Sequence, residues 1–172
     1  RLAASLGDRL QACRLALALG RLENLSGRLA RAEELLLEGR TLAEQGSYPR
    51  EACIADEYLG YVLLARGEPE RAVANYRQGM TRSRTIATGN DLEGELQRRL
   101  GEAHLAAGRL DEAVAAAQAA LAICAQCGEA YEIGFCHLTL GRARVQLGDS
   151  AAADDHFRQA VATFHDQSLP HL

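Results

Sequence analysis

The segment LGRARVQLGDSAAADDHFRQA, residues 140–160, carries a pattern that occurs four times in the chain. It opens with a Leu-Gly pair, places a second glycine seven residues after the first, and ends in small residues. The pair recurs at intervals of 40, 41 and 40 residues, at Leu19-Gly20, Leu59-Gly60, Leu100-Gly101 and Leu140-Gly141. A fixed period in this range is typical of a solenoid, in which each unit buries its apolar face against its neighbours.

Four further columns keep the same register. The second glycine stands at Gly27, Gly67, Gly108 and Gly148, followed five residues later by Ala32, Ala72, Ala113 and Ala153. The next two columns hold Leu36, Tyr76, Ala117 and Phe157, and then the small residues Gly39, Gly79, Ala120 and Ala160. Helices that pack closely need small residues, and a bulky side chain fills the gap beside them. Each unit therefore predicts a helix, a short turn and a second helix, with no strand.

These columns resemble the tetratricopeptide repeat, and the resemblance extends from about Gly7 to Gln167. It implies an all-α fold, a right-handed solenoid of antiparallel helix pairs. The unit is about six residues longer than the common form, as in cell-polarity adaptors, kinesin light chains and large bacterial regulators. The aromatic residue usual four positions before the first glycine is absent, and Ala16, Asp56, Gln97 and His137 stand there.

The repeat register also predicts the domain boundaries. We expect a single domain, 1–172, with units at approximately 8–46, 47–89, 90–128 and 129–168. Residues 1–7 resemble the end of a preceding unit's helix, with Gly7 as its stop, so we expect a piece excised from a longer protein. Second helices are expected to end at Gly46, Gly89 and Gly128, and the next ones to begin at Ser47, Asn90 and Glu129.

Composition argues against several classes of partner. The net charge of −4 and the pI near 5.8 argue against direct binding of nucleic acid. The sequence shows no run of 18 apolar residues and no secretion leader, so we expect no membrane partner. All 19 basic residues are arginine, and with abundant alanine, leucine and glycine this bias indicates a GC-rich bacterial genome.

Five cysteines raise the question of a metal site, because Cys124, Cys127 and the pair Cys136-His137 have the ligand types that zinc prefers. The repeat columns favour a structural role instead. Cys13 and Cys53 share a column with glycines in the other units, and Cys136 shares one with apolar residues. Buried free cysteine behaves as a small hydrophobic residue. We therefore expect no metal and no cofactor, and unpaired cysteines suit a reducing cytoplasm.

The chemistry of an enzyme is also not indicated. The five histidines lie in different helices and columns, and the neighbours Cys136 and His137 would point in different directions on a helix. The glycines are about forty residues apart rather than gathered in a phosphate-binding loop. We therefore expect a binding module without catalytic residues.

The surface expected to bind a partner is the concave face formed by the first helix of every pair. In tetratricopeptide proteins this face carries residues about six and three before the first glycine, one after it, and four to five after it. Carried onto this chain, these positions select Arg14, Arg21, Asn24, Glu57, Tyr61, Leu64, Arg98, Glu102, Leu105, Leu138, Arg142 and Gln146. Arginine and tyrosine are enriched in the energetic centres of interfaces. The alternative is that these side chains form solvated faces with internal pairs such as Arg98–Glu102.

Three functions fit these expectations. In the first interpretation, the chain is a regulatory solenoid of a larger bacterial signalling or transcription protein, and it binds a protein, a peptide or another domain of its own chain. Alternatively, it is a stand-alone adaptor or scaffold. The third interpretation is a self-association module that forms a homodimer.

Overall fold

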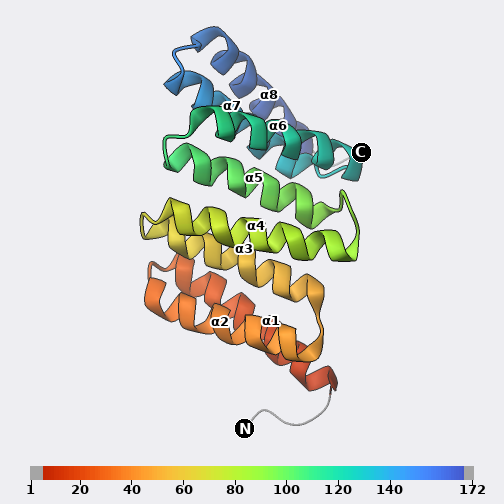
Figure 1. Cartoon of the computed structure of the whole chain (residues 1–172). Coiled ribbons are helices and arrows are strands. Elements are labelled where there is room, and N and C mark those ends of the chain that lie inside the picture. The colour runs from red at the N-terminus through yellow and green to blue at the C-terminus, as the bar shows by residue number, and fades with distance from the viewer. Residues whose placement is uncertain (1–5, 169–172) are drawn as a thin grey trace. The chain divides into compact units, whose positions relative to one another are not determined.

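The computed structural model describes residues 6–168, which form eight α-helices and, within that range, no strand (Figure 1). The predicted all-α fold of helix pairs is confirmed. The chain divides into two compact units, one ending at Thr88 and one beginning at Gly89. This division falls beside the boundary predicted between the second and third repeats, while the exact repeat boundaries stay a prediction.

The first unit contains two helical hairpins. Its helices are α1 (Leu6–Leu25), α2 (Leu29–Gly46), α3 (Pro49–Ala65) and α4 (Pro69–Ile86). Within this unit α1 packs on α2 and α3 packs on α4, and α1 also contacts α3 directly. Because α2 contacts both α1 and α3, the two first helices lie side by side with α2 behind them.

The second unit repeats this plan. Its helices are α5 (Asp91–Ala106), α6 (Leu110–Cys127), α7 (Ala130–Gln146) and α8 (Ser150–Ser168). Here α5 pairs with α6, α7 pairs with α8, and α5 contacts α7 directly. The two first helices of this unit therefore also form one layer.

The structure shows two physical reasons why glycine recurs in these columns. Gly27, Gly67, Gly108 and Gly148 all adopt positive φ, between 71° and 80°, in the turns inside the hairpins. Three of the first-column glycines, Gly20, Gly60 and Gly141, lie under side chains of the paired helix instead, whereas a β-carbon at Gly101 would lie 3.3 Å from backbone atoms of α6. A β-carbon added to Gly20 would lie 2.6 Å from Leu36 Cγ, and one added to Gly141 would lie 2.5 Å from Phe157 Cε1.

Three predicted helix boundaries differ in the structure, at Ser47, at Gly7 and at Gly89. The last differs because α4 already ends at Ile86. Gly46 is the last residue of α2, and the left-handed position that follows it is occupied by Ser47, with φ 54°. Ser47 therefore ends α2 rather than beginning α3. Of the three predicted helix starts, Ser47, Asn90 and Glu129, only Asn90 caps its helix with its side chain. Its Oδ1 accepts a 3.0 Å hydrogen bond from the Glu93 amide. Gly7 lies in the first turn of α1 rather than ending an earlier helix, and residues 1–5 of the expected stub lie outside the described part of the chain.

Helix α6 is the only described helix long and apolar enough to span a membrane by length and composition, with a mean hydropathy of 1.2. The sequence-based expectation had found no such segment. In this structure α6 packs against α5 and α7 and buries the alanines of the repeat columns, Ala113, Ala117 and Ala120. Those contacts are the ones expected of a second helix in a repeat.

A basic cleft between the first two repeats

A cleft of about 350 Å³ opens between α1 and α3, the two first helices of the first unit. It extends over about two turns of each helix, because its lining residues span seven positions on α1, from Arg14 to Arg21, and eight positions on α3, from Arg50 to Tyr58. Its floor is apolar and its rim carries three arginines and one glutamate. The lining residues are Arg14, Leu17, Ala18 and Arg21 of α1, and Arg50, Glu51, Ile54 and Tyr58 of α3.

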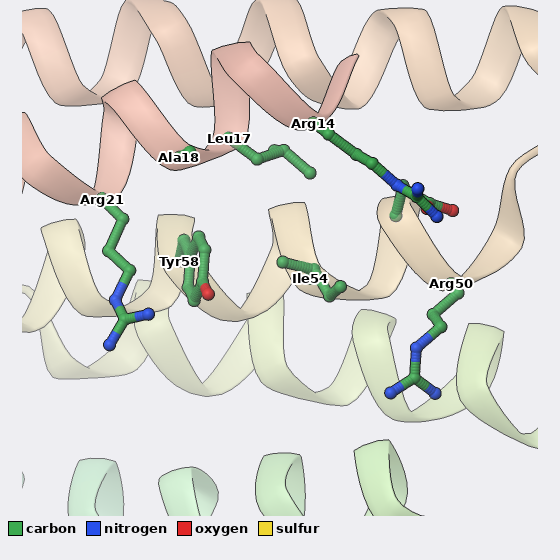
Figure 2. Close-up of a pocket in the computed structure, with 8 residues that line it drawn as sticks. Arg14, Leu17, Ala18, Arg21, Arg50, Ile54 and Tyr58 are labelled. Atoms are coloured by element: carbon green, nitrogen blue, oxygen red, sulfur yellow. The ribbon is translucent and has the colours of Figure 1, made fainter. Parts of the chain in front are cut away.

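The charged groups lie at the two ends of this cleft (Figure 2). At one end Arg14 Nε donates a 2.9 Å hydrogen bond to Oε1 of Glu51, a carboxylate that is itself buried, and Arg50 lies on the same side. At the other end the guanidinium of Arg21 lies 5.7 Å from the centre of the Tyr58 ring. Within the described residues no carboxylate pairs with Arg21.

The apolar floor of the cleft is held in place by the packing of the repeat helices. Leu17 is buried, and a β-carbon on Gly39 of α2 would lie 2.6 Å from Leu17 Cδ2. Ile54 of α3 packs against the same hydrophobic core. The apolar residues of the cleft are therefore part of the helix packing, while the arginines stand on its rim.

The six groove residues predicted in the first unit do not behave alike. Arg14 and Arg21 line the cleft, as described above. Glu57 is buried, and Asn24, Tyr61 and Leu64 are half-buried. Tyr61 lies beside Tyr58, with ring centres 6.3 Å apart. None of these four lines the cleft.

Sequence reasoning missed six of the eight lining residues, namely Leu17 and Ala18 of α1 and Arg50, Glu51, Ile54 and Tyr58 of α3. Ile54 stands six residues before Gly60, which is the column that selected Arg14 in the first unit but was not applied to the second. Arg50 and Tyr58 stand in columns that the family resemblance does not assign to the groove. For these two, the sequence offered no signal beyond helical spacing from Ile54.

In the second unit the structure corrects one prediction. Arg98 is fully buried, so its guanidinium is not available to a partner, and its NH1 group lies 2.7 Å from Glu102 Oε1. Its Nε group pairs with Glu132 as well. The internal Arg98–Glu102 pair considered as the alternative is therefore present. The other predicted residues, Leu105, Leu138, Arg142 and Gln146, are half-buried or exposed.

Four of the five cysteines are buried, and Cys127 is exposed. Cys13 donates from its thiol to the Gly39 carbonyl at 3.2 Å, and burial raises the pKa of Cys13 and Cys53 to about 11. No group of three or more histidine, cysteine, aspartate or glutamate side chains able to hold a metal occurs among the described residues. The buried thiols act as small apolar groups with one weak hydrogen bond.

Two family profiles described as tetratricopeptide repeat match residues 92–164 and 55–78, and together they cover more than half of the chain. No match was found among curated proteins.

Solved structures share the helical architecture. BtubC (BKLC) from P. vanneervenii is similar with a TM-score of 0.77 and 16% identity, over 93% of this chain and 66% of that chain. A Podosopora anserina putative kinesin light chain with nearly identical TPR-like repeats is similar with a TM-score of 0.70 and 22% identity, over 92% of this chain and 77% of that one. MamA (MSR-1) has a TM-score of 0.57 and 22% identity, over 91% of this chain and 79% of that one. This chain thus spans just under two thirds of BtubC, and at these identities the likeness concerns the fold.

Proposed function

Because this chain belongs to the tetratricopeptide repeat family, we propose that it is a non-catalytic protein-binding module whose α1–α3 cleft receives a segment of the partner. Tetratricopeptide repeats serve as scaffolds for protein–protein interaction. The observation that supports this site is the cleft itself, which combines a fixed apolar floor with a rim of arginines. Such a combination is typical of a binding site, since apolar contacts supply affinity and a few polar groups fix orientation.

The proposal is tested by photo-crosslinking in the source cell. A benzoylphenylalanine residue replaces Ala18, an exposed residue that lines the cleft, and in a matched control it replaces Ala74, an exposed residue of α4. A protein crosslinked from position 18 and not from position 74 supports recognition in the cleft. Absence of any protein adduct at both positions would contradict the proposed function.

We further propose that the module regulates a larger bacterial signalling or transcription protein in the cytoplasm. The exclusive use of arginine among basic residues and the five free cysteines support a bacterial, reducing setting. The unit of about forty residues, resembling the long-unit variety of the family, also supports it. The reading frame around this segment is the test. A kinase, ATPase or DNA-binding domain in that frame supports the regulator, and repeats alone support the adaptor.

One observation favours self-association as a second candidate. Leu15, Leu19 and Leu22 form an exposed stripe on α1, although the same columns are buried in α3, α5 and α7. A second copy that covers this stripe would bury it as the other units bury theirs. Sedimentation velocity of the parent and of a Leu19→Gln, Leu22→Gln variant tests this candidate. A dimer lost in the variant supports it, and a parent that stays monomeric over a wide range of concentration refutes it.

A further inference from the structure

Two buried cysteines of the second unit lie in contact where its two repeats meet. Cys124 stands in the last turn of α6 and Cys136 in the first half of α7, and the two helices pack on each other. Cys124 is 1% exposed and Cys136 is 0% exposed. Their thiols are hydrogen-bonded to each other, so the two sulfur atoms already face each other inside the core.

The repeat register supports this placement. Cys124 corresponds to Ala43 of α2, and Cys136 corresponds to Ala55 of α3. Both alanines are fully buried and belong to one hydrophobic cluster of the first unit. The same two positions of consecutive repeats therefore share a core in both units, and only the second unit places thiols there.

The hydrogen bond makes the two thiols chemically unequal. It lowers the pKa of Cys124, with burial opposing in part, and raises the pKa of Cys136. Cys124 is therefore the thiol that ionises more readily, and the thiolate is the form that oxidants attack. A second thiol beside it can then convert the first oxidation product into a disulfide.

The position of Cys124 gives a small oxidant a route to it. Its carbonyl accepts a 2.9 Å hydrogen bond from the Glu129 amide, which lies beyond the end of α6, and Cys127 in the same helix turn is exposed. Terminal helix turns open locally at a lower free energy than the core does. Opening of this one turn is therefore sufficient to admit the oxidant.

The other cysteines lack this arrangement. Cys13, Cys53 and Cys127 each donate to a backbone carbonyl rather than to another thiol. Burial raises the pKa of Cys13 and Cys53 to about 11. Among the five cysteines, all of which the structure describes, only Cys124 combines a lowered pKa with a hydrogen-bonded thiol.

We propose that Cys124 and Cys136 form an oxidative modification site, at which hydrogen peroxide converts the two thiols into a reversible disulfide between α6 and α7. The Cys124 thiolate attacks one peroxide oxygen, the O–O bond breaks, and a sulfenic acid forms as hydroxide leaves. The Cys136 sulfur then attacks the Cys124 sulfur, the S–O bond breaks and water leaves. The two thiols lose two protons and two electrons, and the peroxide is reduced to two molecules of water.

The disulfide would tie the third repeat to the fourth. It would close a loop between residues that are 12 positions apart, which restricts the unfolded chain and so raises the melting temperature. A dithiol reductant would reverse it. In a reducing compartment such disulfides are transient and sense oxidants, so the site fits the cytoplasmic setting proposed above.

The test treats the folded whole chain with hydrogen peroxide and maps its thiols by mass spectrometry. After acid quenching and alkylation of the remaining thiols, cleavage after Glu129 or Glu132 separates Cys136 from Cys124. We expect the peptides of Cys124 and Cys136 to be joined as the main linked product, with the loss of two hydrogen atoms. The link should also form in Cys127→Ala and should disappear after reduction with dithiothreitol.

The matched variants are Cys124→Ala and Cys136→Ala, which place the alanine of the first unit at the same repeat positions. Cys136→Ala should stop at the sulfenic acid of Cys124, which dimedone traps, and Cys124→Ala should leave Cys136 reduced. The oxidised parent should melt at a higher temperature than the reduced parent, and peroxide should not raise the melting temperature of either variant. Circular dichroism confirms that each variant is folded before it is oxidised.

Three results would overturn the proposal. The first is a main product that links Cys124 to Cys127. The second is the same mixture of linked pairs from the folded chain as from a chain oxidised in urea, because the folded geometry would then select nothing. The third is a folded chain in which Cys124 and Cys136 stay reduced at a peroxide concentration that fully oxidises the exposed Cys127.

Discussion

The ring of Tyr76 lies directly over Gly60, so that a β-carbon at Gly60 would overlap the ring edge. Tyr76 is fully buried. The glycine of the Leu-Gly pair is therefore required by the aromatic residue sixteen positions later, and the two columns are coupled.

This coupling predicts that Gly60→Ala destabilises the protein although alanine favours a helix. The overlap costs about 1–3 kcal/mol of stability. Replacing glycine by alanine in a helix gains at most about 1 kcal/mol, so the cost outweighs the gain over most of this range. Urea unfolding of Gly60→Ala, Tyr76→Leu and the double variant measures the effect. The Gly60→Ala penalty should shrink in the Tyr76→Leu background, because a leucine side chain is smaller and more flexible than the ring, and an unchanged penalty would contradict the coupling.

The leucine of the Leu-Gly pair differs in solvent exposure between the repeats, and this difference predicts different effects of its substitution. Leu140 is 1% exposed and Leu19 is 40% exposed, although both occupy the same column. Leu140→Ala should cost about 2–5 kcal/mol of unfolding free energy because it leaves a cavity. Leu19→Ala should cost less than about 1 kcal/mol, since water already reaches this side chain. A comparable loss in both variants, measured by urea unfolding, would show that Leu19 is covered in solution.

Arg98 and Arg142 provide a further contrast, because both were expected on the same groove and only Arg98 is buried. Burial lowers the pKa of Arg98, but Glu102 and Glu132 raise it more, so the guanidinium stays charged. Arg98→Ala would leave Glu102 and Glu132 without it, and we expect a loss of about 3 kcal/mol in stability. Arg142→Ala should change stability by less than about 0.5 kcal/mol. Thermal unfolding of both variants distinguishes a structural arginine from an exposed one.

The same residues show which features of the structure can be predicted from the sequence and which cannot. The glycine and alanine columns predicted the hairpins and their turns because close packing and positive φ are local demands that each unit repeats. The burial of Arg98 was not predictable from its column, because it depends on Glu132, which lies 34 residues further along the chain. The exposure of Leu19 escaped prediction for a related reason. A repeat column specifies which face of a helix is apolar, whereas the neighbouring unit decides whether that face is covered.

A pair of histidines predicts the pH dependence of the second unit. His137 Nδ1 of α7 lies 3.2 Å from His156 Nδ1 of α8, so one ring donates and the other must be neutral to accept. Burial lowers the pKa of His137, the charge of His156 lowers it further, and Asp155 opposes this in part. The unfolded chain therefore binds a proton more readily than the folded one. Stability should be complete above the unfolded value of about 6.5 and should fall as the pH drops below it.

The expected loss is at most about 1.4 kcal/mol per pH unit for the one proton that binds on unfolding. Urea unfolding at pH 7.5 and pH 5.5 measures it in the parent and in His137→Gln. The change in stability between the two pH values should be smaller in the variant, because glutamine does not titrate. Comparing the change rather than the absolute stability removes any constant cost of the substitution. If His137→Gln lost as much stability on acidification as the parent, the pH sensitivity would have to arise from other groups.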